Sequence, residues 1–377
     1  MSSIRISLLH PFSAKAIGLT EKDLYFSHSQ PHEKALRKIQ SKDFKVSIAY
    51  FTGNVIPYSK NIEGVKKQFW PITKPMIRRK HKWRKQYSFW HYLNTFFKPA
   101  DCTINNMSGH GSGYIFKLGE LLVKKNKPYL AMIGGLHMSM TGNALNYYKN
   151  AEHLIVHTNL QKQELQKNKD FQKLDIRVMP LGIDIEKFKP IKRENSNNLL
   201  YVGRISRLKQ LEIAIEAVAK LIENKIEDVR FIIIGPESDK NYFKELKDLI
   251  IKLNIEKNVI FKGVIAHEKL ISYYQNADLL LLPSAHESFG MVMVESMACG
   301  TPVAAIKGSG GPDEIVDDGF NGLLNNKNNY GLNILEYFKN NEMRNRFSKE
   351  ARSKVLKEYS IEKTYKVLKK SVEDILD

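Results

Sequence analysis

Residues 277–322 constrain the fold of this chain more than any other stretch, because two short apolar strands and the helix between them are set out in order. The run 279–282 predicts a buried strand that Pro283 ends, and residues 301–305 begin the next strand. Strand, helix and strand in such close succession favour a parallel sheet covered by helices.

The segment between these strands has the features of a site for a nucleotide-sugar. Ser288 is placed to cap a helix over residues 289–299, and a helix N-terminus presents unpaired N–H groups to a diphosphate. Glu287 and Glu295 are eight residues apart, about 12 Å along a helix axis. A carboxylate at each end of a diphosphate would accept hydrogen bonds from sugar and ribose hydroxyls. An ordinary amphipathic helix with two solvated glutamates explains the spacing equally well.

A second candidate site segment follows a strand predicted at residues 199–202. Gly203 permits close backbone approach there, and Arg204 and Lys209 place two cations near a helix start, as a diphosphate site requires. We interpret Arg207 as part of a charged turn. In the first half, His137 follows a glycine pair at a strand end, where it is either a site residue or a structural histidine.

Length and charge divide the chain in two. It has 377 residues, which is more than a single hydrophobic core usually organises. A polar linker near residues 192–198 predicts one domain over residues 1–190 and a second from residue 191 onward. Residues 1–190 hold 31 Lys and Arg against 13 Asp and Glu, whereas residues 191–377 hold 28 against 27. The basic first half implies an anionic partner.

Residues 64–100 concentrate this charge beside aromatic rings. They contain ten Lys and Arg, no acidic residue and all three tryptophans. Basic and aromatic residues together suit an anionic membrane surface, while a basic solvated face over core aromatics is the alternative. Nucleic acid, which such residues also suit, is not the partner that we expect.

Two cysteines give no disulfide framework or metal-ligand spacing, and no apolar run is long enough to span a bilayer. We therefore expect a cytoplasmic protein that is either cytosolic or bound peripherally at the inner face of the membrane.

Taken together, four stretches of the second half make the chain resemble the retaining glycosyltransferases of family four, also called glycosyl transferases group 1. These stretches are YVGRISRLKQ (201–210), IIIGPESD (232–239), residues 259–304 and GSGGPDEIVDDGFNGLL (308–324). The first half is similar only in outline, at GGLHM (134–138) and VMPLGIDIEKFKP (178–190). The family often has Gly after the lysine of the first stretch, where this chain has Gln210.

The resemblance implies a GT-B fold, in which two Rossmann-like α/β domains face each other across a cleft. It implies that the donor lies on residues 191–358, the acceptor on residues 1–190, and that a helix in 359–377 crosses back to the first domain. Arg204 and Lys209 match the cations at the diphosphate, Glu287 the glutamate at the donor sugar, and Glu295 the glutamate at the ribose. The remaining matches are Phe289, Gly290 and Met291, whose backbone approaches the donor, and His137 near the sugar.

The expected activity is that of a hexosyltransferase, which moves a sugar from a nucleoside-diphosphate sugar to a glycan or lipid-linked acceptor with retention, in cell-surface glycan, polysaccharide or glycolipid synthesis. No Asp-x-Asp triplet occurs in the sequence, so we expect Arg204 and Lys209 to stabilise the leaving diphosphate without a metal or other cofactor. The alternatives are a nucleotide-sugar epimerase of the same architecture and a non-catalytic membrane-binding protein.

Overall fold

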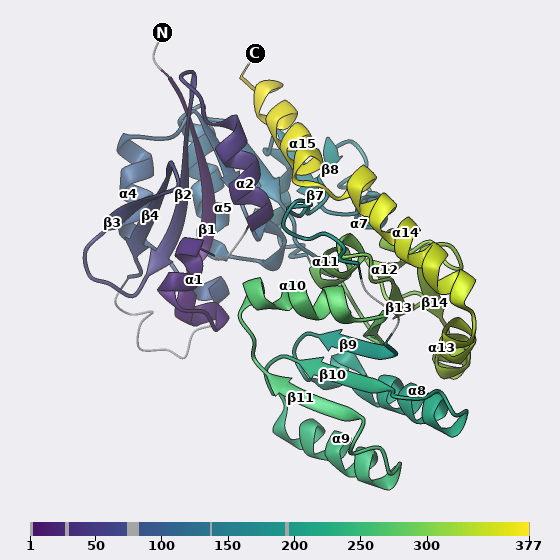
Figure 1. Ribbon diagram of the computed structural model, residues 1–377. Coiled ribbons are helices and arrows are strands. Elements are labelled where there is room, and N and C mark those ends of the chain that lie inside the picture. The colour runs from purple at the N-terminus through teal and green to yellow at the C-terminus, as the bar shows by residue number, and fades with distance from the viewer. Residues whose placement is uncertain (1–2, 27–29, 74–82, 136–137, 193–195, 377) are drawn as a thin grey trace. The chain divides into compact units, whose positions relative to one another are not determined.

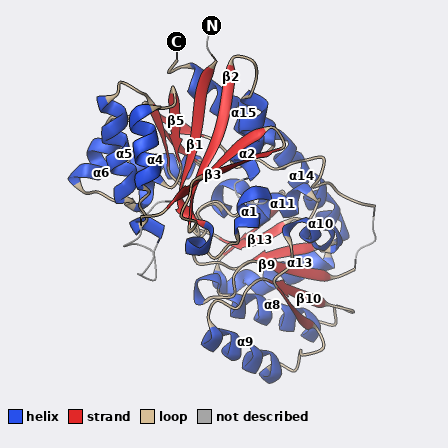
Figure 2. Cartoon of the chain, turned by 90° about the vertical axis from the view of Figure 1, so that its left-hand side faces the viewer, coloured by secondary structure: helices blue, strands red, loops and turns tan. Residues whose placement is uncertain are grey.

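The computed structural model describes residues 3–26, 30–73, 83–135, 138–192 and 196–376, and they fold into two compact units. The first unit consists of residues 1–181 and 361–377, and the second of residues 182–360. Both are α/β units with helices on the faces of a central sheet (Figures 1 and 2).

The first sheet has the order β3-β4-β2-β1-β5-β6-β7-β8 over the described residues, and all neighbours are parallel except the antiparallel pair β3 and β4. Its strands are β1 (Ile4–Ser13), β2 (Phe44–Thr52), β3 (Tyr58–Ile62), β4 (Val65–Pro71), β5 (Cys102–Asn105), β6 (Tyr129–Met132), β7 (His153–Val156) and β8 (Ile176–Val178). The helices of this unit are α1 (Glu21–Phe26), α2 (Gln30–Ile39), α4 (Phe89–Phe97), α5 (Gly113–Lys124), α6 (Gly142–Lys149), α7 (Asn159–Gln166) and α15 (Ile361–Glu373).

The second sheet has the order β11-β10-β9-β12-β13-β14 and is parallel throughout its described strands. Its strands are β9 (Asn198–Val202), β10 (Arg230–Ile234), β11 (Val259–Gly263), β12 (Leu279–Leu282), β13 (Val303–Ile306) and β14 (Gly322–Asn325). The helices are α8 (Leu211–Glu223), α9 (Lys240–Lys252), α10 (His267–Asn276), α11 (Met291–Ala298), α12 (Pro312–Ile315), α13 (Tyr330–Lys339) and α14 (Asn341–Glu358). Every residue of β12 and β13 is buried, because helices cover both faces of a parallel sheet, and this explains their unbroken apolar sequence.

The boundary between the units lies earlier than the predicted 190/191. Residues 182–190 belong to the second unit because α14 holds their backbone: Arg352 donates to the carbonyl oxygens of Ile185 and Phe188 at 3.0 and 2.7 Å. The N–H of Ile183 also donates to Tyr359, at 2.9 Å. The final helix, α15, belongs to the first unit, where Lys38 of α2 pairs with Glu362 and the hydroxyl of Thr364 donates to Pro180 at 2.8 Å.

Part of the basic aromatic segment 64–100 is core, and residues 74–82 lie outside the described residues. Phe69 is buried in β4, where its ring stacks between Tyr50 and Tyr58. Of the helices in the part of the chain that the structure describes, none is long and apolar enough to cross a membrane.

Lys67 is a basic residue of this segment that is wholly buried. Its ammonium group donates to the carbonyl oxygens of Leu24 and Tyr25 at 2.9 and 2.6 Å and pairs with the buried carboxylate of Glu33 on α2. Burial lowers the pKa of Lys67, and the bond to Glu33 opposes that shift. The pair ties α2 to β4, the strand next to the edge of the first sheet.

We expect Lys67→Met to destabilise the first unit by about 3 kcal/mol, because it leaves the buried Glu33 carboxylate with fewer partners. The exposed neighbour Lys66 supplies the control, since Lys66→Met should change stability by less than about 0.5 kcal/mol. Urea unfolding of both variants measures the difference, and equal midpoints would show that the buried pair contributes nothing.

Candidate functional site

Three loops of the second unit meet at the carboxyl ends of its central strands. The chain runs from β9 to β10 and β11 on one side, then resumes on the other side of β9 with β12. Open parallel sheets bind their ligands at such a reversal of strand order. The loops after β9, β12 and β13 are joined there, since Ala285 donates its N–H to Leu208 at 3.0 Å and Glu287 donates to Ser309 at 2.8 Å.

Glu287 is held by both its backbone and its side chain. It forms a parallel bridge with Gly310, and its carbonyl oxygen accepts the N–H of Gly311 at 2.7 Å. Its carboxylate accepts the hydroxyl of Ser284 at 3.0 Å and pairs with the ammonium group of Lys209. The side chains of Lys209 and Glu287 are only 16% and 13% exposed, so the ion pair is shielded from water. A carboxylate is thereby fixed beside the reversal point of the sheet.

The glycine loop after β13 has to pass this close to Glu287, and its sequence allows it. A Cβ on Gly310 would lie 2.5 Å from the carbonyl oxygen of Glu287, and one on Gly311 would lie 2.3 Å from that of Phe289. Gly310 also has φ +108°, a conformation that favours glycine. Asp313 secures the loop from its other side, by accepting the N–H groups of Gly308 and Gly310 at 2.7 and 2.9 Å.

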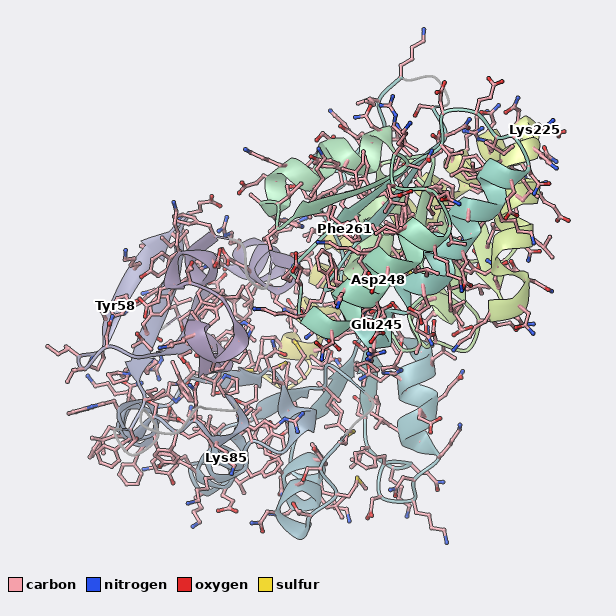
Figure 3. The ribbon with its side chains drawn as sticks, turned by 90° about the horizontal axis from the view of Figure 1, so that it is seen from below. Tyr58, Lys85, Lys225, Glu245, Asp248 and Phe261 are labelled. Atoms are coloured by element: carbon pink, nitrogen blue, oxygen red, sulfur yellow. The ribbon has the colours of Figure 1, made fainter. Side chains whose placement is uncertain are left out.

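The three cations after β9 have different surroundings. Lys209 is engaged by Glu287, whereas the exposed side chain of Arg204 forms no ion pair with any described residue. Arg207 pairs with Glu245 of α9, which Figure 3 labels, and lies 3.8 Å from Asp239. Arg207 is thus part of a charged surface turn, as the sequence indicated.

Gln210, at the position where the family often has Gly, directly precedes α8 and has φ +48°. That left-handed conformation suits glycine best, which accounts for the family's preference. Gly203 also lies where two backbones approach closely. A Cβ added to Gly235, at the end of the adjacent strand, would lie only 1.8 Å from the carbonyl oxygen of Gly203.

The helix after Glu287 differs from the prediction. It is α11, which covers Met291–Ala298 instead of 289–299, and Ser288 does not cap it. Glu287 is tied to the glycine loop, residues 288 and 289 bend the chain, and the helix begins only after Gly290, which has φ +87°. Gly290, the N-cap of α11, has no side chain to cap the helix, and Met293 donates its N–H to the carbonyl oxygen of Gly290 at 2.9 Å. The N–H groups that precede Met293 are therefore the ones left for a ligand. Phe289 is buried, and Met291 is the first residue of the helix.

Glu295 lies within α11 but does not reach outward as a solvated glutamate would. Its side chain is 7% exposed, its Oε1 lies 2.7 Å from Nε2 of His267, and its Oε2 accepts the hydroxyl of Tyr274 at 2.7 Å. Only Glu295 of the two glutamates is helical, so the helical rise of 12 Å predicted from their spacing does not apply.

Sequence reasoning missed His267 and Tyr274. They are seven residues apart on α10, which places them on one face of that helix, and this spacing was the available signal. Phe188 packs beside both, with its ring centroid 5.7 Å from that of His267 and 6.4 Å from that of Tyr274. His137, the candidate from the first half, lies outside the described residues.

The fold and this site together define a class of protein. It has two Rossmann-like units, and in one of them cations, a fixed carboxylate and a helix N-terminus meet where the strand order reverses.

Solved structures share the fold over the whole chain. Sucrose-phosphate synthase from Thermosynechococcus elongatus has a TM-score of 0.74 at 18% identity and covers 99% of both chains. Anabaena HepE, solved in complex with UDP, has a TM-score of 0.75 at 16% identity and covers 98% of this chain and 100% of its own. These are GT-B glycosyltransferase folds.

Residues 182–354 match the profile of the family "Glycosyl transferases group 1". The second unit is therefore similar to the glycosyl transferases group 1. Curated relatives include the D-inositol 3-phosphate glycosyltransferases of Corynebacterium jeikeium, 35% identical, and Corynebacterium urealyticum, 37% identical, each over 191 residues. Those alignments cover 46% of this chain and 45% of each relative, so the match spans less than half of the relatives' length.

The contact between His267 and Glu295 predicts a measurable titration. The hydrogen bond to Glu295 raises the pKa of His267 above its ordinary 6.5, against the effect of burial. The protonated ring therefore adds stability that is fully present below pH 6.5 and is lost as pH rises through the raised pKa. We expect NMR titration to place the pKa of His267 above 6.5, and Glu295→Gln to bring it down. An unchanged pKa in that folded variant would contradict the contact.

Proposed function

We propose that this protein transfers a sugar, a hexose by our expectation, from a nucleoside-diphosphate sugar to a hydroxyl group of an acceptor. The observation that carries the proposal is the shielded pair of Lys209 and Glu287, set between adjacent loops at the reversal point of the second sheet. A cation and a carboxylate held side by side suit the two parts of such a donor, since the diphosphate is anionic and the sugar presents hydroxyl groups.

The diphosphate part of the donor would bind at the cations and the helix N-terminus. Arg204 has an exposed guanidinium group without an ion pair among the described residues. Lys209 would bind a phosphate oxygen either by leaving Glu287 or by contacting both groups at once. The uncapped start of α11, with Phe289, Gly290 and Met291, offers backbone N–H groups to phosphate oxygens. Gly203 would leave room for the backbone beside the diphosphate.

The hydroxyl groups of the donor would be bound by the two glutamates. We assign Glu287 to the sugar, where its charge also stabilises positive charge developing on the ring, and Glu295 to the ribose. His267 and Tyr274 each occupy one oxygen of Glu295, and a carboxylate with about four lone-pair sites can still accept ribose hydroxyls. His137 is assigned to the sugar by the resemblance alone.

We further propose that the transfer retains the configuration at the anomeric carbon, by attack of the acceptor on the face from which the diphosphate leaves. The bond from the anomeric carbon to the donor phosphate oxygen breaks, and the bond to the acceptor oxygen forms. The acceptor's proton passes to the leaving phosphate oxygen, so no enzyme base is required. Glu287 is occupied by Lys209 and Ser284, which suits a charge-stabilising role better than that of a covalent nucleophile.

The names of the similar proteins support a proposal about the substrates of this chain. HepE was solved with UDP, and the curated relatives are D-inositol 3-phosphate glycosyltransferases. We propose a nucleoside diphosphate as the donor's leaving group and a glycan or lipid-linked acceptor in cell-surface glycan or polysaccharide synthesis. A nucleotide-sugar epimerase of the same architecture would instead yield an isomer of the donor sugar, and release of free nucleotide during transfer distinguishes the two.

Arg204→Ala and Glu287→Gln should each lower the rate of donor turnover by about 10²-fold, because each removes charge stabilisation at the reacting centre. Arg207→Ala is the matched control, since that arginine lies three residues away but pairs with Glu245 at the surface, and it should keep nearly the wild-type rate. Release of nucleoside diphosphate from a panel of nucleotide-sugars, with thermal melting as the folding check, measures the effect. Wild-type rates in both site variants would mean that the site is misassigned.

We also expect the transfer to be independent of divalent metal, because Arg204 and Lys209 stabilise the leaving diphosphate. Turnover should be unchanged by EDTA and by added manganese. Loss of turnover in EDTA that manganese restores would contradict this expectation while leaving the sugar-transfer assignment intact.

A further inference from the structure

Helix α4 of the first unit presents its apolar side outward and its polar side inward. His91 and Thr95 are buried, and Nδ1 of His91 lies 2.5 Å from the hydroxyl of Tyr114 on α5. The hydroxyl of Thr95 donates to the carbonyl oxygen of His91 at 2.9 Å. Burial lowers the pKa of His91 to about 4, so the inward side of the helix is uncharged at neutral pH.

The outward side of α4 is a stripe of large apolar side chains. The exposed fractions are 51% for Phe89, 49% for Trp90, 42% for Phe96 and 70% for Phe97. At about 100° per residue these four positions fall within roughly 120° of the helix circumference, and the half-buried Leu93 lies in the middle of that arc. We call Phe89, Trp90, Leu93, Phe96 and Phe97 the aromatic stripe. Burial in the protein cannot explain an arrangement in which polar residues are inside and aromatic residues outside.

Cations flank the stripe on several sides. Arg84 and Lys85 precede α4, Lys98 follows it, and Lys124 and Lys125 end the neighbouring helix α5; all five are exposed. Lys125 places its ammonium group 3.8 Å from the ring centroid of Phe96, so the two helix ends lie together. Figure 1 shows α4 beside β3 and β4 of the first unit, and Figure 3 labels Lys85 on the same unit.

The nearest acidic side chain in sequence is already engaged. Asp101 pairs with Lys127 at 2.9 Å and accepts the N–H of Arg5 at 2.9 Å, and these contacts lower its pKa. Residues 64–100 contain no acidic residue at all. The five exposed cations beside the stripe therefore outnumber the acidic residues of the same segments, which are Asp101 and the exposed Glu120 of α5.

We propose that the aromatic stripe of α4 docks this protein on an anionic lipid bilayer surface. Phenylalanine and tryptophan rings insert at the level of the head groups, and the surrounding lysines and arginines attract negatively charged lipids. A second copy of the chain would bring like charges together around the stripe, and single-stranded nucleic acid would leave the apolar arc only partly covered. The aromatic stripe shares no residue with those assigned to sugar transfer, and its role does not depend on them.

Vesicle sedimentation of the full chain tests this proposal, with vesicles of phosphatidylcholine alone and of phosphatidylcholine mixed with phosphatidylglycerol. The wild-type protein should bind the anionic vesicles much more strongly, and added salt should weaken the binding. The double variant Trp90→Ser and Phe97→Ser should bind at least about tenfold less, because both side chains leave the interface. Lys124→Gln and Lys125→Gln should each weaken binding to the anionic vesicles about fivefold and leave binding to the neutral vesicles unchanged.

The control is Val264→Ser, which removes an equally exposed apolar side chain from the second unit and should not change binding. Thermal melting and nucleoside diphosphate release in the absence of lipid should be unaffected in the stripe variants. The proposal fails if the wild-type protein binds neither vesicle, or if the stripe variants and Val264→Ser bind equally. It also fails if the stripe variants abolish a dimer or the binding of single-stranded nucleic acid while vesicle binding is unchanged.

Discussion

The ion pair between Lys209 and Glu287 is the interaction around which three loops of the second unit are arranged. Its two members come from loops that follow adjacent strands, and the glycine loop of a third strand closes against Glu287 through backbone hydrogen bonds. The pair is shielded from water, so each partner would be costly to leave alone. In the function that we propose, a diphosphate that engages Lys209 would also affect Glu287, and this would link binding of the diphosphate to orientation of the attached sugar.

This arrangement separates the rigid part of the site from the adaptable part. Gly310 and Gly311 have no room for a side chain, and Asp313 fixes their loop from behind. Arg204, by contrast, is exposed and forms no ion pair within the described ranges, so in the function that we propose its side chain could adjust to a diphosphate. Glu295 belongs to the rigid part, because His267 and Tyr274 hold both of its oxygens.

The first unit carries most of the positive charge, and its structure shows that this charge has more than one use. Lys67 is buried with Glu33 and holds α2 against the sheet, which no count of basic residues would reveal. The exposed cations beside α4 surround aromatic side chains that the core does not need. We regard the two uses as independent, because one stabilises the unit and the other faces a partner.

The sequence by itself determined the fold class, the resemblance of the second unit to a glycosyltransferase family and the segments that we propose as the site. Apolar runs such as 279–282, glycines where backbones touch and the cations after β9 are local features, and local features can be read along the chain. Only the tertiary structure decided how they meet. The helix begins at Met291 because Glu287 is tied to a glycine loop more than twenty residues later. Glu295 has His267 and Tyr274 as partners because α10 packs against α11, and α4 faces outward with its aromatic side because its polar side packs on α5. Each of these outcomes depends on contacts between residues far apart in the chain, which no local pattern encodes.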